Sequence, residues 1–144
     1  MWEFKTHKSG VLYLCLEDTY ARIQNRLYKI TDEAPSELRI ATTSFQIGNG
    51  LEQQIEQYLS DFPNTKLVII DTFQKVRDSK NSGGKSGMYA GDYDDVSALK
   101  NISDKYGIAV VVVHHVRKLK DVSDPFNEVS GSTGITGAAD TNLF

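Results

Sequence analysis

Side chains that can do chemistry follow three separate apolar runs of the sequence. In chain order they are Glu17, then Asp71 with Thr72, then His114 with His115. A short apolar run rich in β-branched residues is typical of a strand that is buried on both faces of a parallel sheet. The carboxyl ends of such strands share one edge of the sheet, where open α/β folds bind their ligands. We therefore expect these side chains to meet around one ligand.

The residue types in this set suit phosphoryl transfer. Asp71 can hold Mg²⁺ on a nucleotide, and Thr72 beside it fits the same role. Glu17 can orient or deprotonate the attacking water, although a carboxylate at a helix entry is also stabilised by the helix dipole alone. A polar side chain on a neighbouring strand, such as His115, can sense the γ-phosphate. Consecutive strand residues point to opposite faces, so His114 and His115 cannot both reach one metal, which argues against a dinuclear hydrolase.

The elements that must position these side chains alternate along the chain. Apolar runs predict strands over residues 11–16, 38–42, 66–72 and 108–113. Apolar residues at spacings of three and four predict helices over residues 20–30, 51–62 and 96–106. Asp18 or Thr19 can cap the first helix, Pro63 stops the second and Gly107 closes the third. This order predicts right-handed crossovers and a three-layer α/β fold, a parallel sheet with helices on both faces.

Two stretches lack any periodicity. Residues 74–92 are polar and rich in glycine and serine, and residues 116–137 are basic at first and then rich in glycine, serine and threonine. Long irregular segments between regular elements are usually functional loops, so we expect a loop in each place. Residues 140–144 are expected to begin one more strand.

The composition is that of an ordinary soluble domain. The chain has 144 residues, of which 40% are hydrophobic and 24% charged, and its net charge of −3 argues against a broad attraction to nucleic acid. Cys15 is the single cysteine, so no disulfide framework exists. No apolar run reaches membrane-spanning length, and the first residues lack the apolar stretch of a signal peptide. We expect a cytoplasmic protein without a membrane partner.

Four motifs in order resemble one family. They are Val-Leu-Tyr-Leu-Cys-Leu-Glu-Asp at 11–18, Val-Ile-Ile-Asp-Thr at 68–72, Val-Val-His-His-Val-Arg-Lys at 112–118 and Ser-Gly-Ser-Thr-Gly-Ile-Thr-Gly-Ala-Ala-Asp at 130–140. Together they resemble the RecA-like ATPase domains of plasmid and phage replicative helicases, the RepA type. The similarity covers nearly the whole chain and implies a RecA-like P-loop NTPase core.

The resemblance assigns roles to the strand-end residues and to the loops. It implies that Glu17 is the catalytic glutamate, that Asp71 is the Walker B aspartate on Mg²⁺, and that His115 occupies the sensor position. ATP and Mg²⁺ are the implied cofactors, and single-stranded DNA and a homo-hexamer are the implied partners. The loops over residues 74–92 and 118–131 would face the DNA channel. Their candidate DNA-binding cations are Arg77, Lys80, Lys85, Lys118 and Lys120.

The phosphate-binding motif Gly-x-x-x-x-Gly-Lys-[Ser/Thr] has no good match in the sequence. Gly84-Lys85-Ser86 comes nearest, but residue 79 is serine where the motif has glycine, and no strand directly precedes it. The resemblance places the true motif before Trp2, so we expect residues 1–144 to form one partial, N-terminally truncated domain. The P-loop strand is expected to lie centrally in the sheet. Without it, strand edges would be exposed, and we expect the chain to self-associate.

Two other functions remain open from the sequence. The chain can be a non-catalytic remnant that acts as a DNA-binding or interaction module. It can also be a RecA-like recombinase or regulatory ATPase rather than a helicase. Both alternatives share the fold and differ in what the strand-end residues do.

Overall fold

The described part of the chain folds around one small parallel sheet. A computed structural model describes residues 5, 7–77, 84–115 and 133–143. The strands are β1 (Gly10–Cys15), β2 (Leu38–Ala41), β3 (Thr65–Asp71) and β4 (Ala109–Val113). The helices are α1 (Tyr20–Leu27), α2 (Leu51–Asp61), α3 (Phe73–Val76), α4 (Gly84–Tyr106) and α5 (Thr133–Ala138).

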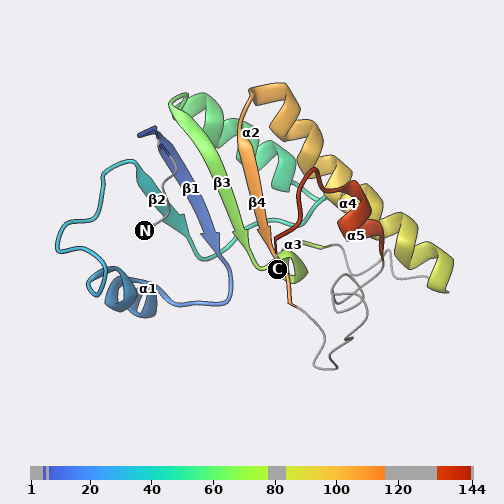
Figure 1. Cartoon of the computed structure of the whole chain (residues 1–144), viewed down its shortest axis with the longest axis horizontal. Helices are drawn as coiled ribbons and strands as arrows, with labels where there is room; N and C mark the ends of the chain where they lie inside the picture. The colour runs from blue at the N-terminus through green and yellow to red at the C-terminus, as the bar shows by residue number, and fades with distance from the viewer. Residues whose placement is uncertain (1–4, 6, 78–83, 116–132, 144) are drawn as a thin grey trace.

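All four described strands run in the same direction, in the order β2-β1-β3-β4. Figure 1 shows their arrowheads at the same end of the sheet. Cys15 pairs with Asp71, and Asp71 pairs with Val113, so the ends of β1, β3 and β4 are level. The predicted α/β fold with a parallel sheet is confirmed.

One face of the sheet carries the hydrophobic core. Alternate residues of β1 and β3 point to this face and pack with α2 and α4, which both cover it. Val68, Ile70 and Leu51 are fully buried, since none of the three has any exposed surface. The remaining members of this cluster are Leu12, Leu14, Ile47, Ile55, Leu59, Phe73, Val76, Leu99, Ile102, Ile108 and Ile135.

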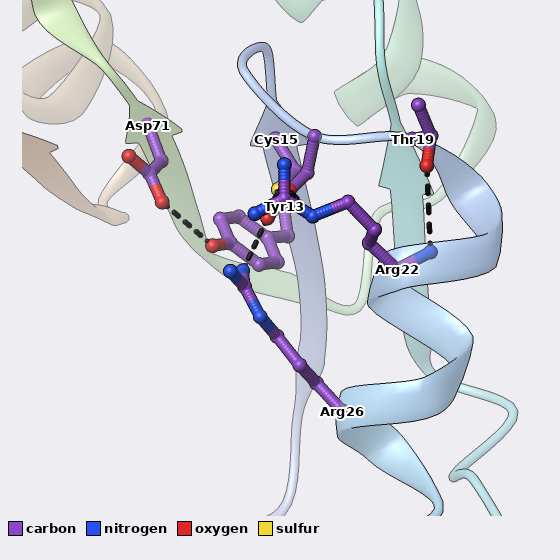
Figure 2. A network of polar contacts seen from close by, with 7 residues as sticks. Tyr13, Cys15, Thr19, Arg22, Arg26 and Asp71 are labelled. Carbon is purple, nitrogen blue, oxygen red and sulfur yellow. Dashed lines mark hydrogen bonds and ion pairs between the residues drawn. The ribbon is translucent and has the colours of Figure 1, made fainter.

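The opposite face is less completely covered. Tyr13 and Cys15 point to this face, and α1 lies near them (Figure 2). Ile23 is the buried residue of α1, whereas Tyr20 and Ile30, predicted on the same apolar face, are exposed. Ile30 lies outside α1, because the helix ends at Leu27. Helix α1 is therefore shorter and less buried than its periodicity predicts.

Three sequence-based expectations are wrong for at least part of the residues that the structure describes. Most of the expected loop over residues 74–92 is helical. Residues 74–76 belong to α3 and residues 84–92 belong to α4, while residues 78–83 lie outside the described part. In the second expected loop, over residues 116–137, residues 133–137 belong to α5, and residues 116–132 are not described. Residues 140–143 form no strand. Glycine and serine lower helix propensity, which is why the local sequence favours a loop at the start of α4.

A search of the described helices for a membrane span gives a negative result. None of them is both long enough and apolar enough to cross a bilayer.

Candidate functional site at the strand ends

The residues singled out at the strand ends lie at one edge of the sheet, and Glu17 contacts both Thr72 and His115. Glu17 comes two residues after β1, Asp71 ends β3, and His115 comes two residues after β4, with β3 between the other two strands. Oγ1 of Thr72 donates a hydrogen bond of 3.0 Å to Oε1 of Glu17. Nε2 of His115 lies 3.7 Å from Oε2 of the same carboxylate. The expectation that these residues share one edge of the sheet is confirmed, while their chemical roles remain predictions.

Asp71 is held from two directions. Its carbonyl oxygen accepts a bond of 2.6 Å from the backbone N–H of Leu16, which extends the pairing of β1 with β3. Its carboxylate accepts a bond of 2.8 Å from the hydroxyl of Tyr13 (Figure 2). Burial, followed by the neighbouring Cys15 and Asp71, raises the pKa of Tyr13, so the phenol keeps its proton and acts as a donor. The sequence did not predict the hydrogen bond from Tyr13 to Asp71, because Tyr13 lies in an apolar run where it is expected to be a core residue of the strand.

Glu17 and Thr72 differ in how far they are exposed. Thr72 is buried, with 2% of its surface exposed, whereas the side chain of Glu17 is 43% exposed. The Thr72 hydroxyl thus reaches from the interior to a carboxylate that solvent and a ligand can reach. The Thr72 hydroxyl donates its hydrogen bond to Glu17, and the lone pairs of its oxygen remain compatible with the predicted cofactor role.

The two histidines separate, as alternation predicts. The His115 side chain is 66% exposed and faces Glu17. The His114 ring instead packs edge-on against Phe73, with ring centroids 5.8 Å apart at 81°. His115 is therefore the histidine that lies at the strand-end site.

Asp18 does not cap α1, which corrects one of the two alternatives. Thr19 is the cap, because its side chain accepts a bond of 3.4 Å from the backbone N–H of Arg22. The Asp18 carboxylate instead pairs with Arg22 at 3.1 Å and with Arg26. Figure 2 shows both arginines reaching from α1 toward Tyr13 and Cys15. The arginine spacing of four along one helix was the available signal for this ion-pair cluster.

The predicted DNA-binding cations are placed unevenly. Arg77 pairs with Asp92, and its Nε lies 3.5 Å from Oδ2 of Asp95. These carboxylates are buried, and the Arg77 side chain is 18% exposed, so it lies in a buried ion-pair cluster rather than in an open loop. Lys85 belongs to the first turn of α4, and its side chain is not described. Lys80, Lys118 and Lys120 lie outside the described residues.

The donor set fits a metal that arrives with its substrate. Within residues 5, 7–77, 84–115 and 133–143, no group of three or more histidine, cysteine, aspartate or glutamate side chains could hold a metal ion. Mg²⁺ is commonly bound by one or two carboxylates together with water and substrate phosphates. Asp71 can supply one such carboxylate, since Tyr13 occupies Oδ2 and the carboxylate has a second oxygen.

A groove of about 660 Å³ follows the outer edge of β4. Val111 lines this groove and is 46% exposed, and β4 is an edge strand of the described sheet. Residues 138–143 form the opposite wall of the groove. Nζ of Lys100, in α4, donates hydrogen bonds of 2.6 and 2.7 Å to the two carboxylate oxygens of Asp140 in this wall. The groove is therefore bounded by a strand edge on one side and a fixed segment on the other.

Comparison with known families gives a match over most of the chain. The model of a family described as an AAA domain matches residues 1–121, which is most of the chain. A search of curated proteins finds no significant match. The matched region contains the four described strands and the strand-end site. The chain therefore belongs to this AAA domain family, and it is an ATPase domain of the AAA/RecA-like type.

Proposed function

We propose that the chain is the central part of a DNA helicase motor, in which ATP hydrolysis drives movement along single-stranded DNA. The observation that carries this proposal is the meeting of Glu17, Asp71 with Thr72, and His115 at the carboxyl ends of adjacent parallel strands. These groups come from distant parts of the sequence, and a purely structural helix-entry carboxylate does not require them to meet. The resemblance to plasmid and phage replicative helicases supports the specific motor class.

In the proposed site, Asp71 and Thr72 hold the Mg²⁺ of Mg-ATP. The ion, when bound, neutralises charge that develops on the transferring phosphate. Asp71 can take this role because its backbone and its Oδ2 are both fixed, which leaves the direction of the second oxygen defined. The Walker B assignment therefore corresponds to a carboxylate that is already oriented before a ligand arrives.

Glu17 is proposed to orient and deprotonate the attacking water. Its side chain is accessible, as a general base must be, and Thr72 fixes one of its oxygens. His115 faces the other oxygen and is the proposed sensor of the γ-phosphate. Because His115 directly precedes the basic stretch that begins at Val116, a change at the phosphate can pass to the segment proposed to face DNA.

The β- and γ-phosphates need a backbone cradle that this site lacks among its described residues. Gly84-Lys85-Ser86 starts α4 and follows α3 rather than a strand, so it does not have the strand–loop–helix setting of a P-loop. We propose that a P-loop strand encoded upstream of Met1 pairs with the open edge of β4. The groove between β4 and residues 138–143 would place that strand centrally, between neighbouring segments.

The reading frame upstream of Met1 gives the first test. About thirty residues upstream should contain Gly-x-x-x-x-Gly-Lys-[Ser/Thr]. The longer protein should hydrolyse ATP in a DNA-stimulated manner, and Glu17→Gln should abolish turnover while nucleotide still binds. Asp61→Asn, at the exposed end of α2, is the matched control and should leave turnover unchanged. Unchanged turnover in Glu17→Gln would remove Glu17 from the mechanism.

DNA binding separates the motor from its alternatives. Strand separation on a forked substrate supports a helicase, whereas DNA-stimulated hydrolysis without separation indicates a recombinase or regulatory ATPase. If the longer protein binds no ATP but the 144-residue chain binds single-stranded DNA in a salt-sensitive manner, the binding-module alternative holds. In that case neutralising Lys80, Lys85, Lys118 and Lys120 should weaken binding and lower its salt dependence.

The proposed assembly is a homo-hexamer of the longer protein. For the 144-residue chain we propose self-association through the open edge of β4, because Ala109–Val113 carries no charge, proline or bulge that would block strand pairing. Sedimentation of both proteins tests this. The longer protein should form rings, and a clean monomer of the 144-residue chain at micromolar concentration would contradict the edge-pairing proposal.

A further inference from the structure

Two hydroxyl groups connect β1 and β3 in opposite directions at the candidate site. Tyr13 of β1 donates to the carboxylate that ends β3, at 2.8 Å. Thr72, directly after β3, donates to the carboxylate that follows β1, at 3.0 Å. Each strand thus supplies one carboxylate and one hydroxyl, and each hydroxyl binds the carboxylate of the other strand.

The register of the two strands makes this exchange feasible. Tyr13 pairs with Ile69, so its side chain lies on the same face as Asp71, two residues further along β3. A diagonal neighbour at this spacing is within reach of a long aromatic side chain. Thr72 is buried and Tyr13 is partly buried, so both hydroxyls are held by packing before they donate. The two carboxylates therefore receive their hydrogen bonds from groups with little freedom to move.

We infer that Tyr13 and Thr72 are positioning residues that fix the directions of the Asp71 and Glu17 carboxylates. This inference rests on the proposed function, because it gives those carboxylates their roles toward metal and water. Tyr13 engages Oδ2 of Asp71, so the other oxygen is presented to a metal ion. Thr72 engages Oε1 of Glu17, so Oε2, the oxygen that faces His115, is presented to water.

The chain offers a matched control for each hydroxyl. The Tyr58 hydroxyl and the Thr65 hydroxyl are buried and find no hydrogen-bond partner among the described residues. Tyr58→Phe and Thr65→Val therefore remove the same atoms as Tyr13→Phe and Thr72→Val without removing a hydrogen bond. Any effect shared by all four variants reflects packing rather than positioning.

The experiment is carbon-detected NMR of the side-chain carboxyl groups in the 144-residue chain, at fixed neutral pH. Tyr13→Phe should move the Asp71 carboxyl resonance and leave that of Glu17 in place, and Thr72→Val should do the reverse. Thr72→Ser keeps the hydroxyl and should restore the wild-type Glu17 resonance. The two control variants should move neither resonance. Equal shifts in the control variants, or none in Tyr13→Phe and Thr72→Val, would overturn the inference.

A wild-type measurement keeps the test valid if Tyr13→Phe does not fold. In the NMR spectrum of the wild-type chain, the Tyr13 hydroxyl proton should give a separate, slowly exchanging resonance that shows a coupling or cross-peak to Asp71. The absence of this resonance would overturn the positioning role of Tyr13.

Titration of the longer protein with Mn²⁺ in the presence of ATP then separates this inference from the proposed function, because the site is proposed to take its metal together with the substrate phosphates. Mn²⁺ should broaden amide signals next to Asp71, and Tyr13→Phe should weaken that binding by about 10-fold, the usual effect of losing an outer-shell partner. Specific carboxyl shifts without Mn²⁺ binding would uphold the positioning role and count against the metal site. Mn²⁺ binding that Tyr13→Phe leaves unchanged would overturn the positioning role and leave the metal site standing.

Discussion

Replacing Arg77 with methionine removes the cation from a buried ion-pair cluster between α3 and α4. Arg77 follows α3, and its guanidinium pairs with Asp92 and lies 3.5 Å from the Asp95 carboxylate. The Asp92 side chain has no exposed surface and that of Asp95 is 7% exposed. The guanidinium carbon also lies 5.6 Å from the centre of the Phe73 ring. Methionine keeps the length and apolar stem of the side chain but supplies no charge.

The burial of the cluster sets the size of the effect. Exposed ion pairs, such as Lys8 with Glu37, contribute about 0–1 kcal/mol. Removing one partner of a buried pair costs about 3–5 kcal/mol, because the remaining charge stays in the interior without its counter-charge. Arg77 is slightly exposed, so we expect Arg77→Met to lower the free energy of unfolding by about 3 kcal/mol. For a domain of this size that corresponds to a fall in Tm of about 10 °C.

Urea unfolding followed by circular dichroism measures this change. Lys75→Met is the matched control, because Lys75 lies two residues earlier, carries the same charge and is exposed. The control should change the free energy of unfolding by less than about 0.5 kcal/mol. A double-mutant cycle with Asp92→Asn should give a coupling energy of about 2 kcal/mol between Arg77 and Asp92.

A small effect would refute the reasoning. If Arg77→Met and Lys75→Met are equally stable, the cluster contributes no more than a surface pair. If Arg77→Met is stable but loses affinity for single-stranded DNA in a fluorescence anisotropy titration, the DNA-binding role predicted from the sequence is the correct one. Loss of stability with unchanged DNA affinity would instead assign Arg77 to the fold.

Three further predictions concern other parts of the chain. Gly107→Ala should cost about 1 kcal/mol in the free energy of unfolding, because φ of +58° disfavours any side chain even though the space is open. Val111→Lys should reduce self-association in sedimentation experiments by placing a charge on the open edge of β4, whereas the same change at the exposed Ile30 should not. The hydrogen bond to Asp140 raises the pKa of Lys100 above its ordinary 10.5, so this ion pair is intact below that value and is lost as the pH rises through the raised pKa. Carbon-detected NMR should show residues 141–143 shifting in that range, and Lys100→Gln should remove the transition.

The sequence was sufficient to predict the sheet and the position of the site. Residues 67–70 and 108–113 are apolar and largely β-branched, and such runs fit a buried parallel strand better than any other element. Once the strands are taken as parallel, the placement of Glu17, Asp71 and His115 at one edge of the sheet follows from the direction of the chain alone. This part of the prediction needed no knowledge of side-chain packing.

The start of α4 and the Tyr13 contact could not be predicted in the same way. Gly84, Gly87 and Gly91 lower helix propensity, so the local sequence favours a loop where the structure has the start of α4. Tyr13 sits in an apolar run, where an aromatic residue reads as core. Its contact with Asp71 depends on how β1 and β3 align, and no local pattern gives the alignment of strands that are fifty residues apart.

The geometry of the candidate site depends on the register in which β3 pairs with β1 and β4. Glu17 and His115 each lie two residues beyond a residue that pairs with Asp71, so they come from the two sides of β3 at the same number of residues past its end. A slip of one residue in either pairing would displace a strand end by about 3.3 Å and turn its side chains to the other face. The bonds of 2.8 and 3.0 Å from Tyr13 and Thr72 would not survive such a displacement. The buried residues Leu14, Val68 and Ile70 fix the register on the core face, so the apolar layer beneath the site determines whether its polar groups can meet.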